Sequence, residues 1–167
     1  MSPRVLMAGV GNVLLGDDGF GVEVVRLLRA GGLPTPERVR IVDYGIRALH
    51  LAYELCEPYD LVILVDAMAR GAPPGSLCVL AADVDDLSEG VLPDAHDLHP
   101  ATVIRLALAL GASLDGMRVV GCEPESVAEG IGLSPAVGRA VPEAVRVVHE
   151  LLRDVPDGGV NIRRSGS

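Results

Sequence analysis

Two acidic side chains and one imidazole are placed where they could hold a divalent metal ion. Asp18 follows the first predicted strand, Asp66 ends the third, and His96 lies in the long segment that follows the fourth. Carboxylate oxygens combined with one imidazole suit borderline metals such as nickel, zinc or manganese. A metal with open positions can polarise a carbonyl group or activate water. The three residues therefore indicate a metal site, provided that the fold brings them together.

Other polar residues follow the same strands. In open parallel sheets, ligands bind beyond the carboxyl ends of the strands, near the point where the strand order reverses. Each residue also has a simpler interpretation: Asp17 or Asp18 can cap the helix that follows, Asp66 can accept amides from its own turn, and a loop histidine is usually a surface residue. Like charges gathered at one edge, however, must be compensated by a proton or a cation. The further candidates at this edge are Asn12, Asp17, Asp43, Gly45 and His99.

Apolar runs of strand length alternate with segments of helical periodicity along the chain. The run LVILV at 61–65 is apolar throughout, as in a parallel strand buried on both faces. This alternation predicts an α/β three-layer sandwich with a mostly parallel, five-stranded twisted sheet and helices on both faces. Strands are expected at 5–10, 38–45, 60–67, 76–82 and 117–123, and helices at 20–28, 48–56, 101–110 and 134–154.

The last predicted helix has a start signal and an interruption. Ser134 can cap it, Pro135 suits its first turn, and Pro142 is expected to break or kink it. No linker or internal repeat divides the chain, so residues 1–154 are predicted to form a single domain. The polar, glycine-rich tail 155–167 is expected to fray.

The composition indicates an acidic, soluble domain. The chain has 167 residues, 49% of them hydrophobic, and a net charge of −9. An acidic surface repels phosphate backbones, which disfavours nucleic-acid binding, and no apolar run is long enough to cross a bilayer. The three cysteines lie far apart in apolar stretches and are expected to be reduced and buried. We therefore expect a cytoplasmic protein that acts as a monomer rather than a dimer.

Two other kinds of site fit the sequence less well. GVGNVLLG (9–16) suggests a dinucleotide-binding loop, but the third glycine of that motif would fall at Leu14, and two aspartates follow where a pyrophosphate needs bare amides. The acidic pair and Asp66 also suggest a phosphoacceptor receiver domain, but the pair lies well beyond the tip of the strand. The lysine expected after the fifth strand is missing, since all 14 basic residues are Arg. Both interpretations are disfavoured.

Read in order, several motifs resemble those of the nickel–iron hydrogenase maturation endopeptidases. The family signature G-x-G-N-x-L-x-x-D-[E/D]-G-x-G appears as GVGNVLLGDDGFG (9–21). The further matches are DYG (43–45), VDA (65–67), HDLHPATV (96–103) and EPESVAEGIGLSPAV (123–137). The resemblance covers nearly the whole chain and implies an α/β fold with a metal-binding cleft.

The resemblance also implies a single reaction, in which a short C-terminal extension is cleaved from the precursor of the hydrogenase large subunit after nickel insertion. The nickel would belong to the substrate, and the family's three ligands fall on Asp18, Asp66 and His96. Many members carry Glu at the position of Asp18, whose side chain reaches roughly 1.5 Å less far. Asp17 is the fallback ligand, and His99 is a second imidazole on the same loop.

No Ser or Cys of this chain lies in a nucleophile elbow, so the expected chemistry depends on the metal or a carboxylate. Asp43 and Gly45 are expected to shape the substrate channel, while Glu123 and Glu125 receive no catalytic role. A non-catalytic nickel carrier or chaperone that uses the same three ligands is the alternative function.

Overall fold

The fold is organised around one sheet in a computed structural model that describes residues 3–31, 38–81 and 100–154. Its strands are β1 (Val5–Val10), β2 (Val39–Gly45), β3 (Leu61–Ala67), β4 (Leu77–Ala81) and β5 (Met117–Cys122). They lie in the order β2-β1-β3-β5-β4. All neighbours pair in parallel except β4, which runs antiparallel to β5 at one edge. The prediction of a mostly parallel, five-stranded sheet is confirmed.

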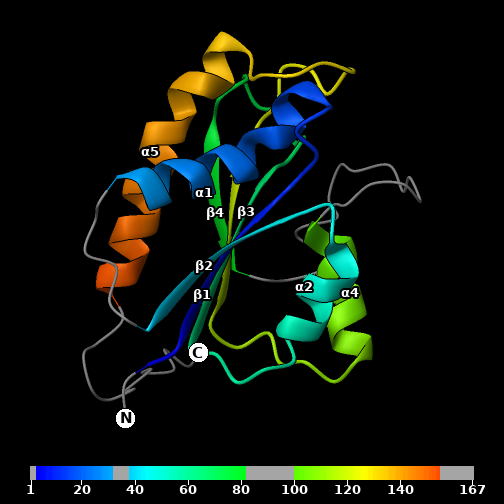
Figure 1. Cartoon of the computed structure of the whole chain (residues 1–167), viewed down its shortest axis with the longest axis vertical. Helices are drawn as coiled ribbons and strands as arrows, with labels where there is room; N and C mark the ends of the chain where they lie inside the picture. The colour runs from blue at the N-terminus through cyan, green and yellow to red at the C-terminus, as the bar shows by residue number, and fades with distance from the viewer. Residues whose placement is uncertain (1–2, 32–37, 82–99, 155–167) are drawn as a thin grey trace.

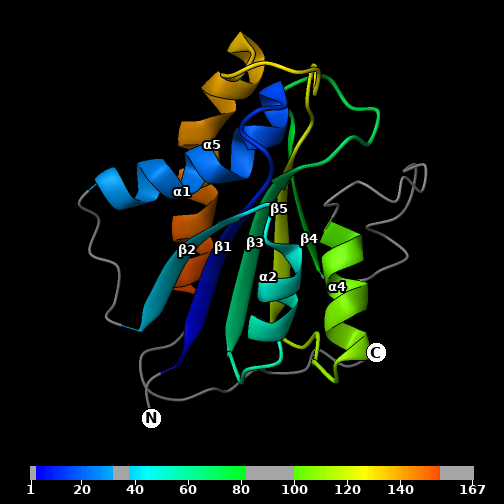
Figure 2. The same ribbon diagram turned by 45° about the vertical axis from the view of Figure 1, so that its right-hand side comes forward.

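Helices cover both faces of this sheet (Figures 1 and 2). They are the 3-10 turn η1 (Gly16–Gly19), α1 (Phe20–Ala30), α2 (Ala48–Glu54), α4 (Pro100–Ala109) and α5 (Pro135–Arg153). Alternate side chains of β1 divide between the two layers: Leu6 and Ala8 pack with α2 and α4, whereas Met7 packs with α1 and α5. Successive side chains of a strand point to opposite faces, so the apolar run of β1 is buried on both sides.

The start of α1 lies directly against the ends of β1 and β3. A Cβ on Gly21 would lie 2.2 Å from the Val65 carbonyl oxygen and 2.5 Å from the Val10 carbonyl oxygen. A Cβ on Gly9 would lie 2.4 Å from the Gly21 carbonyl oxygen. Such distances admit only glycine. These two glycines therefore allow α1, and with it the turn η1, to rest on the two central strands.

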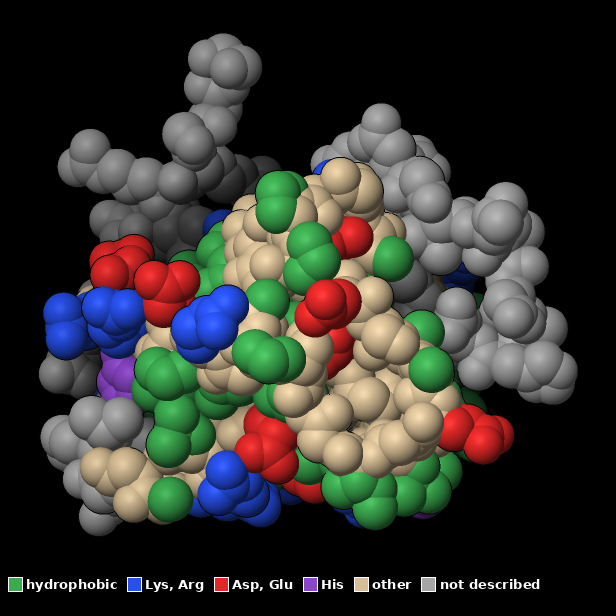
Figure 3. Space-filling model, turned by 90° about the horizontal axis from the view of Figure 1, so that it is seen from above, with side chains coloured by type: hydrophobic (Ala, Val, Ile, Leu, Met, Phe, Trp, Pro, Cys, Tyr) green, Lys and Arg blue, Asp and Glu red, His purple; other side chains and the backbone are tan. Residues whose placement is uncertain are grey.

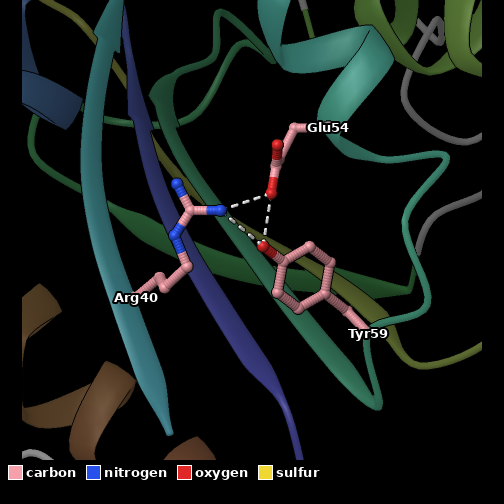
Figure 4. A network of polar contacts seen from close by, with 3 residues as sticks. All are labelled: Arg40, Glu54 and Tyr59. Carbon is pink, nitrogen blue, oxygen red and sulfur yellow. Dashed lines mark hydrogen bonds and ion pairs between the residues drawn. The ribbon is translucent and has the colours of Figure 1, made fainter. Parts of the chain in front are cut away.

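At the amino ends of the strands, a polar network joins β2 to α2 and to the start of β3 (Figure 4). The Tyr59 hydroxyl donates to Glu54 Oε1, and the Arg40 guanidinium donates to that carboxylate and to the Tyr59 oxygen. Burial and the bond to Glu54 raise the pKa of Tyr59. The network fastens α2 to the sheet at the end remote from the candidate ligands.

Element boundaries agree with the sequence-based expectations to within two residues, but details of the last helix do not. α5 continues through Pro142, so the expected break is wrong. Buried Val137, Val141 and Val145 hold the turns on both sides of the proline against the sheet layer. Ser134 is the N-cap residue, yet its hydroxyl caps no helix amide and donates to Asp17 Oδ2 instead.

The cysteines also differ from expectation. Cys122 is buried in β5, as expected, but Cys78 is half-buried and Cys56 is exposed just beyond the end of α2. In the ranges that the structure describes, no helix is long and apolar enough to span a membrane.

Candidate functional site

The carboxyl ends of β1 and β3 form the point where the order of the sheet reverses. The chain moves from β1 outward to β2 on one side, and then returns to place β3 on the other side of β1. The register pairs Gly9 of β1 with Val65 of β3, so Asp66 lies beside the end of β1. In open α/β sheets the crevice at this reversal is the usual ligand site.

Gly11 is the residue on which Asp18 and Asp66 converge. Its φ is +140°, and a Cβ at this position would lie 1.9 Å from the Asp18 carbonyl oxygen and 3.5 Å from Asp66 Oδ1. The turn after β1 thus folds back so that η1 contacts the backbone at Gly11. The side chain of Asp66 approaches the same point from the neighbouring strand.

Backbone amides orient both of these carboxylates. The Asn12 amide donates to Asp18 Oδ2 at 2.9 Å, and the Ala67 amide donates to Asp66 Oδ1 at 2.7 Å. Asp66 is 2% exposed, whereas Asp18 is half-buried. The expectation that Asp66 accepts an amide from its own turn is confirmed. Each carboxylate is thus oriented by a backbone amide close to it in the chain.

Asp43 and Gly45 lie on the β2 side of the same edge. The Gly11 amide donates to the Gly45 carbonyl oxygen at 3.0 Å, and Gly45 has a φ of +53°. Asp43 Oδ1 lies 3.6 Å from the position that a Cβ on Gly45 would occupy. This oxygen is buried and has no hydrogen-bond partner among the described residues. Asp43 therefore places a buried acceptor next to the Gly11 turn.

Asp17 is held in a different environment from its neighbour Asp18. It is 1% exposed, and its carboxylate accepts hydrogen bonds from the amides of Glu125, Ser126 and Ser134 and from the Ser134 hydroxyl, at 2.7–3.1 Å. Burial alone would raise the pKa of Asp17, but these four bonds together lower it. The carboxylate therefore anchors the segment after β5 to the turn after β1.

Backbone pairing strengthens this anchor. The Gly16 amide donates to the Gly130 carbonyl oxygen, and the Gly130 amide donates to the Leu14 carbonyl oxygen, each at 2.9 Å. The Asp17 amide donates to the Ser126 carbonyl oxygen at 3.0 Å. Together these bonds fix η1, and hence Asp18, between the sheet and the segment 125–134.

The sequence left Glu123 without a role, and the structure gives it one. Glu123 is buried, and its carboxylate accepts hydrogen bonds from the amides of Arg70 and Gly71, which follow Asp66 on the loop after β3. The only feature of the sequence that could have indicated this role is the position of Glu123, an acidic residue directly after a buried strand. Nothing in the sequence indicated that its partners lie more than fifty residues earlier in the chain.

His96 and His99 lie outside the residues that the structure describes. Of the expected ligands, Asp18 and Asp66 are among the described residues. The accessory candidates Asn12, Asp43 and Gly45 lie at the same edge of the sheet. Within the described ranges, no group of three or more histidine, cysteine or acidic side chains could hold a metal ion. A three-ligand site with His96 remains a prediction.

Comparison with known proteins gives consistent similarities. A family model described as hydrogenase maturation protease matches residues 22–151. The hydrogenase 2 maturation protease of Escherichia coli K12 is 30% identical over 152 residues, covering 90% of this chain and 92% of that protein. The coenzyme F420 hydrogenase subunit delta of Methanothermobacter thermautotrophicus is 30% identical over 151 residues, covering 87% and 92%. The solved hydrogenase maturating endopeptidase HybD of E. coli superposes with a TM-score of 0.77 at 29% identity, covering 90% and 93%.

Proposed function

The chain belongs to the hydrogenase maturation protease family, and on this premise we propose that it removes a short C-terminal extension from the nickel-loaded precursor of a nickel–iron hydrogenase large subunit. The nickel arrives as part of the substrate. Asp18, Asp66 and His96 are the residues proposed to contact it.

The observation that carries this proposal is the approach of Asp18 and Asp66 to Gly11 at the reversal point of the sheet. Two carboxylates, one from η1 and one from the end of β3, are each oriented by a backbone amide and present negative charge near the same point of the sheet edge. A cation is the ligand that offsets such charge, and oxygen ligands with one imidazole suit nickel. The family membership connects that cation to a hydrogenase precursor.

In the proposed mechanism, some side chains contact the substrate's nickel and another accepts a proton. Contact with the substrate's nickel fixes the position of the precursor, so that the scissile peptide lies at the crevice. Peptide hydrolysis then requires a polarised carbonyl group and a water molecule that loses a proton. The substrate's nickel would supply the polarisation, and the carboxylate that does not contact the metal would accept the proton from water and return it to the nitrogen of the leaving amine as the peptide bond breaks. Asp43, whose Oδ1 has no hydrogen-bond partner among the described residues, is the carboxylate that we assign to that second task.

Incubation with nickel-loaded and nickel-free precursor, followed by mass spectrometry, tests the proposal. We expect a C-terminal truncation of the nickel-loaded form only. Transfer of metal at unchanged precursor mass would indicate the carrier function instead. Cleavage of both forms at equal rates would contradict recognition of the metal.

Substitution of Asp66 or His96 should abolish most of the processing activity without unfolding the protein. Asp66→Asn keeps an oxygen that can accept the Ala67 amide, so the fold should persist while the charge is lost. We expect Asp66→Asn and His96→Ala each to lower the rate of processing at least a hundredfold with an unchanged circular dichroism spectrum. Asp115→Asn, at an exposed position, is the matched control. Full activity of His96→Ala would remove that residue from the site.

A further inference from the structure

Arg70 is an exposed basic residue at the same edge of the sheet as the candidate site. It lies on the loop between β3 and β4, four residues after Asp66. Figure 3, which looks down on this end of the molecule, shows acidic side chains near the middle of the face and arginines toward its margin. A positive charge close to a cation site weakens the binding of the cation, so the presence of Arg70 here calls for a role of its own.

A buried carboxylate fixes the backbone at Arg70. Glu123 is 8% exposed, and its carboxylate oxygens accept the amide of Arg70 at 2.7 Å and that of Gly71 at 3.2 Å. The Met68 amide donates to the carbonyl oxygen of the last residue of β5, and the Gly75 amide donates to that of Glu123, each at 2.8 Å. The loop is therefore held in place although residues 69–74 are all exposed, and the side chain of Arg70 starts from a fixed position.

The register of the sheet shows where the guanidinium of Arg70 lies. Asp66 of β3 pairs with Gly121 of β5, and Gly121 pairs with Cys78 of β4. The three residues form one row across the sheet, and paired residues project to the same face. Arg70 Nη1 lies 4.0 Å from Cys78 Sγ, at the end of this row remote from Asp66. Since neighbouring strands lie about 4.8 Å apart, the guanidinium is on the order of 10 Å from Asp66, or about three residues of extended chain.

The hydrogen-bond donors of this guanidinium are available to a ligand. In the part of the chain that the structure describes, it donates to no oxygen atom, and the sulfur of Cys78 is only a weak acceptor. Arg47, an exposed arginine that follows β2 at the same edge, differs in this respect. Its guanidinium donates to the carbonyl oxygens of Asp43 and Tyr44. Arg47 thus stabilises its own turn, whereas Arg70 is positioned by the loop without being used by it.

We propose that Arg70 binds a carboxylate of the precursor, about three residues of extended chain away from the group that contacts Asp66. A guanidinium matches the two oxygens of a carboxylate with parallel hydrogen bonds. The precursor carries such a group at the end of its C-terminal extension and on acidic side chains next to the scissile bond. The ion pair selects one register of the peptide, because a carboxylate placed at Asp18 or Asp66 is repelled. This inference rests on the proposed function, since it assigns Arg70 to the same substrate.

Steady-state cleavage of the nickel-loaded precursor by the full-length chain tests the role of Arg70. We expect Arg70→Gln to raise KM about tenfold and to change kcat less than about twofold, because a charge-assisted binding contact is lost and the reacting groups stay in place. Arg70→Lys keeps the charge but not the planar fork, so KM should rise only about threefold. Arg153→Gln, at the exposed last residue of α5, is the matched control and should keep the wild-type KM.

Changes in the precursor identify the carboxylate that Arg70 binds. One precursor carries Asn and Gln in place of the Asp and Glu residues next to the scissile bond, and a second carries glycines appended to its C-terminus, which move the terminal carboxylate. The change that removes the partner should raise the wild-type KM about tenfold and leave the KM of Arg70→Gln unaltered, because that variant has already lost the pair. Added NaCl should raise the wild-type KM more steeply than that of Arg70→Gln.

The outcomes separate the role of Arg70 from the proposed function. Absence of cleavage by the wild type would overturn both. Cleavage by the wild type and by Arg70→Gln with equal KM would overturn the assignment of Arg70 alone. A raised KM of Arg70→Gln that neither altered precursor reproduces in the wild type would show that the ligand is not a carboxylate, and a melting temperature lowered in Arg70→Gln would assign the residue to the fold. Either result would also overturn the assignment.

Discussion

Asp17 and Asp18 are neighbours in one 3-10 turn, yet their carboxylates have different surroundings. Asp17 accepts four hydrogen bonds from the segment 125–134, whereas Asp18 accepts the Asn12 amide at the edge of the crevice. The fallback interpretation of Asp17 as a metal ligand is therefore less attractive than an anchoring role. Its donors would have to be given up before it could bind a cation.

Asp17→Asn tests the anchoring role. The amide oxygen can still accept, but the new NH₂ group faces backbone amide donors, so buried donors lose their acceptor. We expect the free energy of unfolding to fall by about 2–3 kcal/mol. Urea denaturation monitored by circular dichroism measures it, with exposed Asp115→Asn expected within about 0.5 kcal/mol of the wild type. Equal stabilities of the wild type and Asp17→Asn would contradict the anchor.

The lowered pKa of Asp17 adds a pH dependence to this prediction. A carboxyl group whose pKa is lower in the folded state stabilises the fold above the unfolded pKa, here the ordinary 3.8. That stabilisation is lost as the pH falls from 3.8 through the lower folded value. The stability difference between wild type and Asp17→Asn should therefore be constant above about pH 5 and shrink below 3.8. A difference that grows on acidification would contradict the assignment.

The thiols should differ in reactivity because their exposure differs. Cys56 is exposed, whereas burial in β5, above all, raises the pKa of Cys122 to about 12. The thiolate is the reactive form, so Cys122 should be inert in the native protein. We expect a thiol reagent at pH 8 to label Cys56 first and Cys122 only in denaturant, as read from labelled peptides by mass spectrometry. Native labelling of Cys122 at the rate of Cys56 would contradict its burial.

At the scale of elements, the placement of η1 depends on Gly11. Gly11→Ala would put a methyl group 1.9 Å from the Asp18 carbonyl oxygen, in addition to its positive φ. We expect a loss of about 3 kcal/mol or more in unfolding free energy, or a folded protein with the turn displaced and processing lost. Gly111→Ala is the matched control, since φ is +97° there and nothing lies within 4 Å. Its cost should be only about 1–2 kcal/mol. Similar losses of unfolding free energy in both variants would show that the close contact between Gly11 and the Asp18 carbonyl oxygen does not limit which residue can occupy position 11.

The elements themselves follow from the sequence because their signals are local. The apolar run of β3 and the periodicity of α1 and α5 depend on neighbouring residues, and they place these elements to within two residues. The behaviour of Ser134 and Pro142 depends on tertiary contacts. Ser134 turns to the carboxylate of Asp17, and packing on both sides of Pro142 keeps α5 continuous. Local rules could not predict either result.

At the scale of the whole molecule, the topology explains how much of the site could be predicted. Asp18 follows the parallel strand β1 and Asp66 lies at the end of the parallel strand β3, so a sheet of this class brings them to one edge, and the reversal between β1 and β3 makes them neighbours. The contacts of Asp17 with Ser134 and of Glu123 with Arg70 join residues 117 and 53 positions apart. A single sequence carries no signal for such pairs. The predictable part of the site is thus the part that topology alone dictates.

The end of α5 suggests where the folded domain ends. α5 ends at Arg153, and Leu151 and Leu152 are, within the described residues, the last side chains that pack against the core between α1, α5 and the sheet. The helix is closed by the Asp154 amide, which donates to the Glu150 carbonyl oxygen at 3.3 Å. Because the segment 155–167 is polar and glycine-rich, a chain ending at Asp154 should melt within about 2 °C of the full chain and process the precursor at the same rate. Scanning calorimetry and the cleavage assay on the two chains side by side measure this. A loss of about 5 °C or more would extend the folded domain beyond Asp154, whereas unchanged melting with slower cleavage would assign residues 155–167 to contact with the precursor.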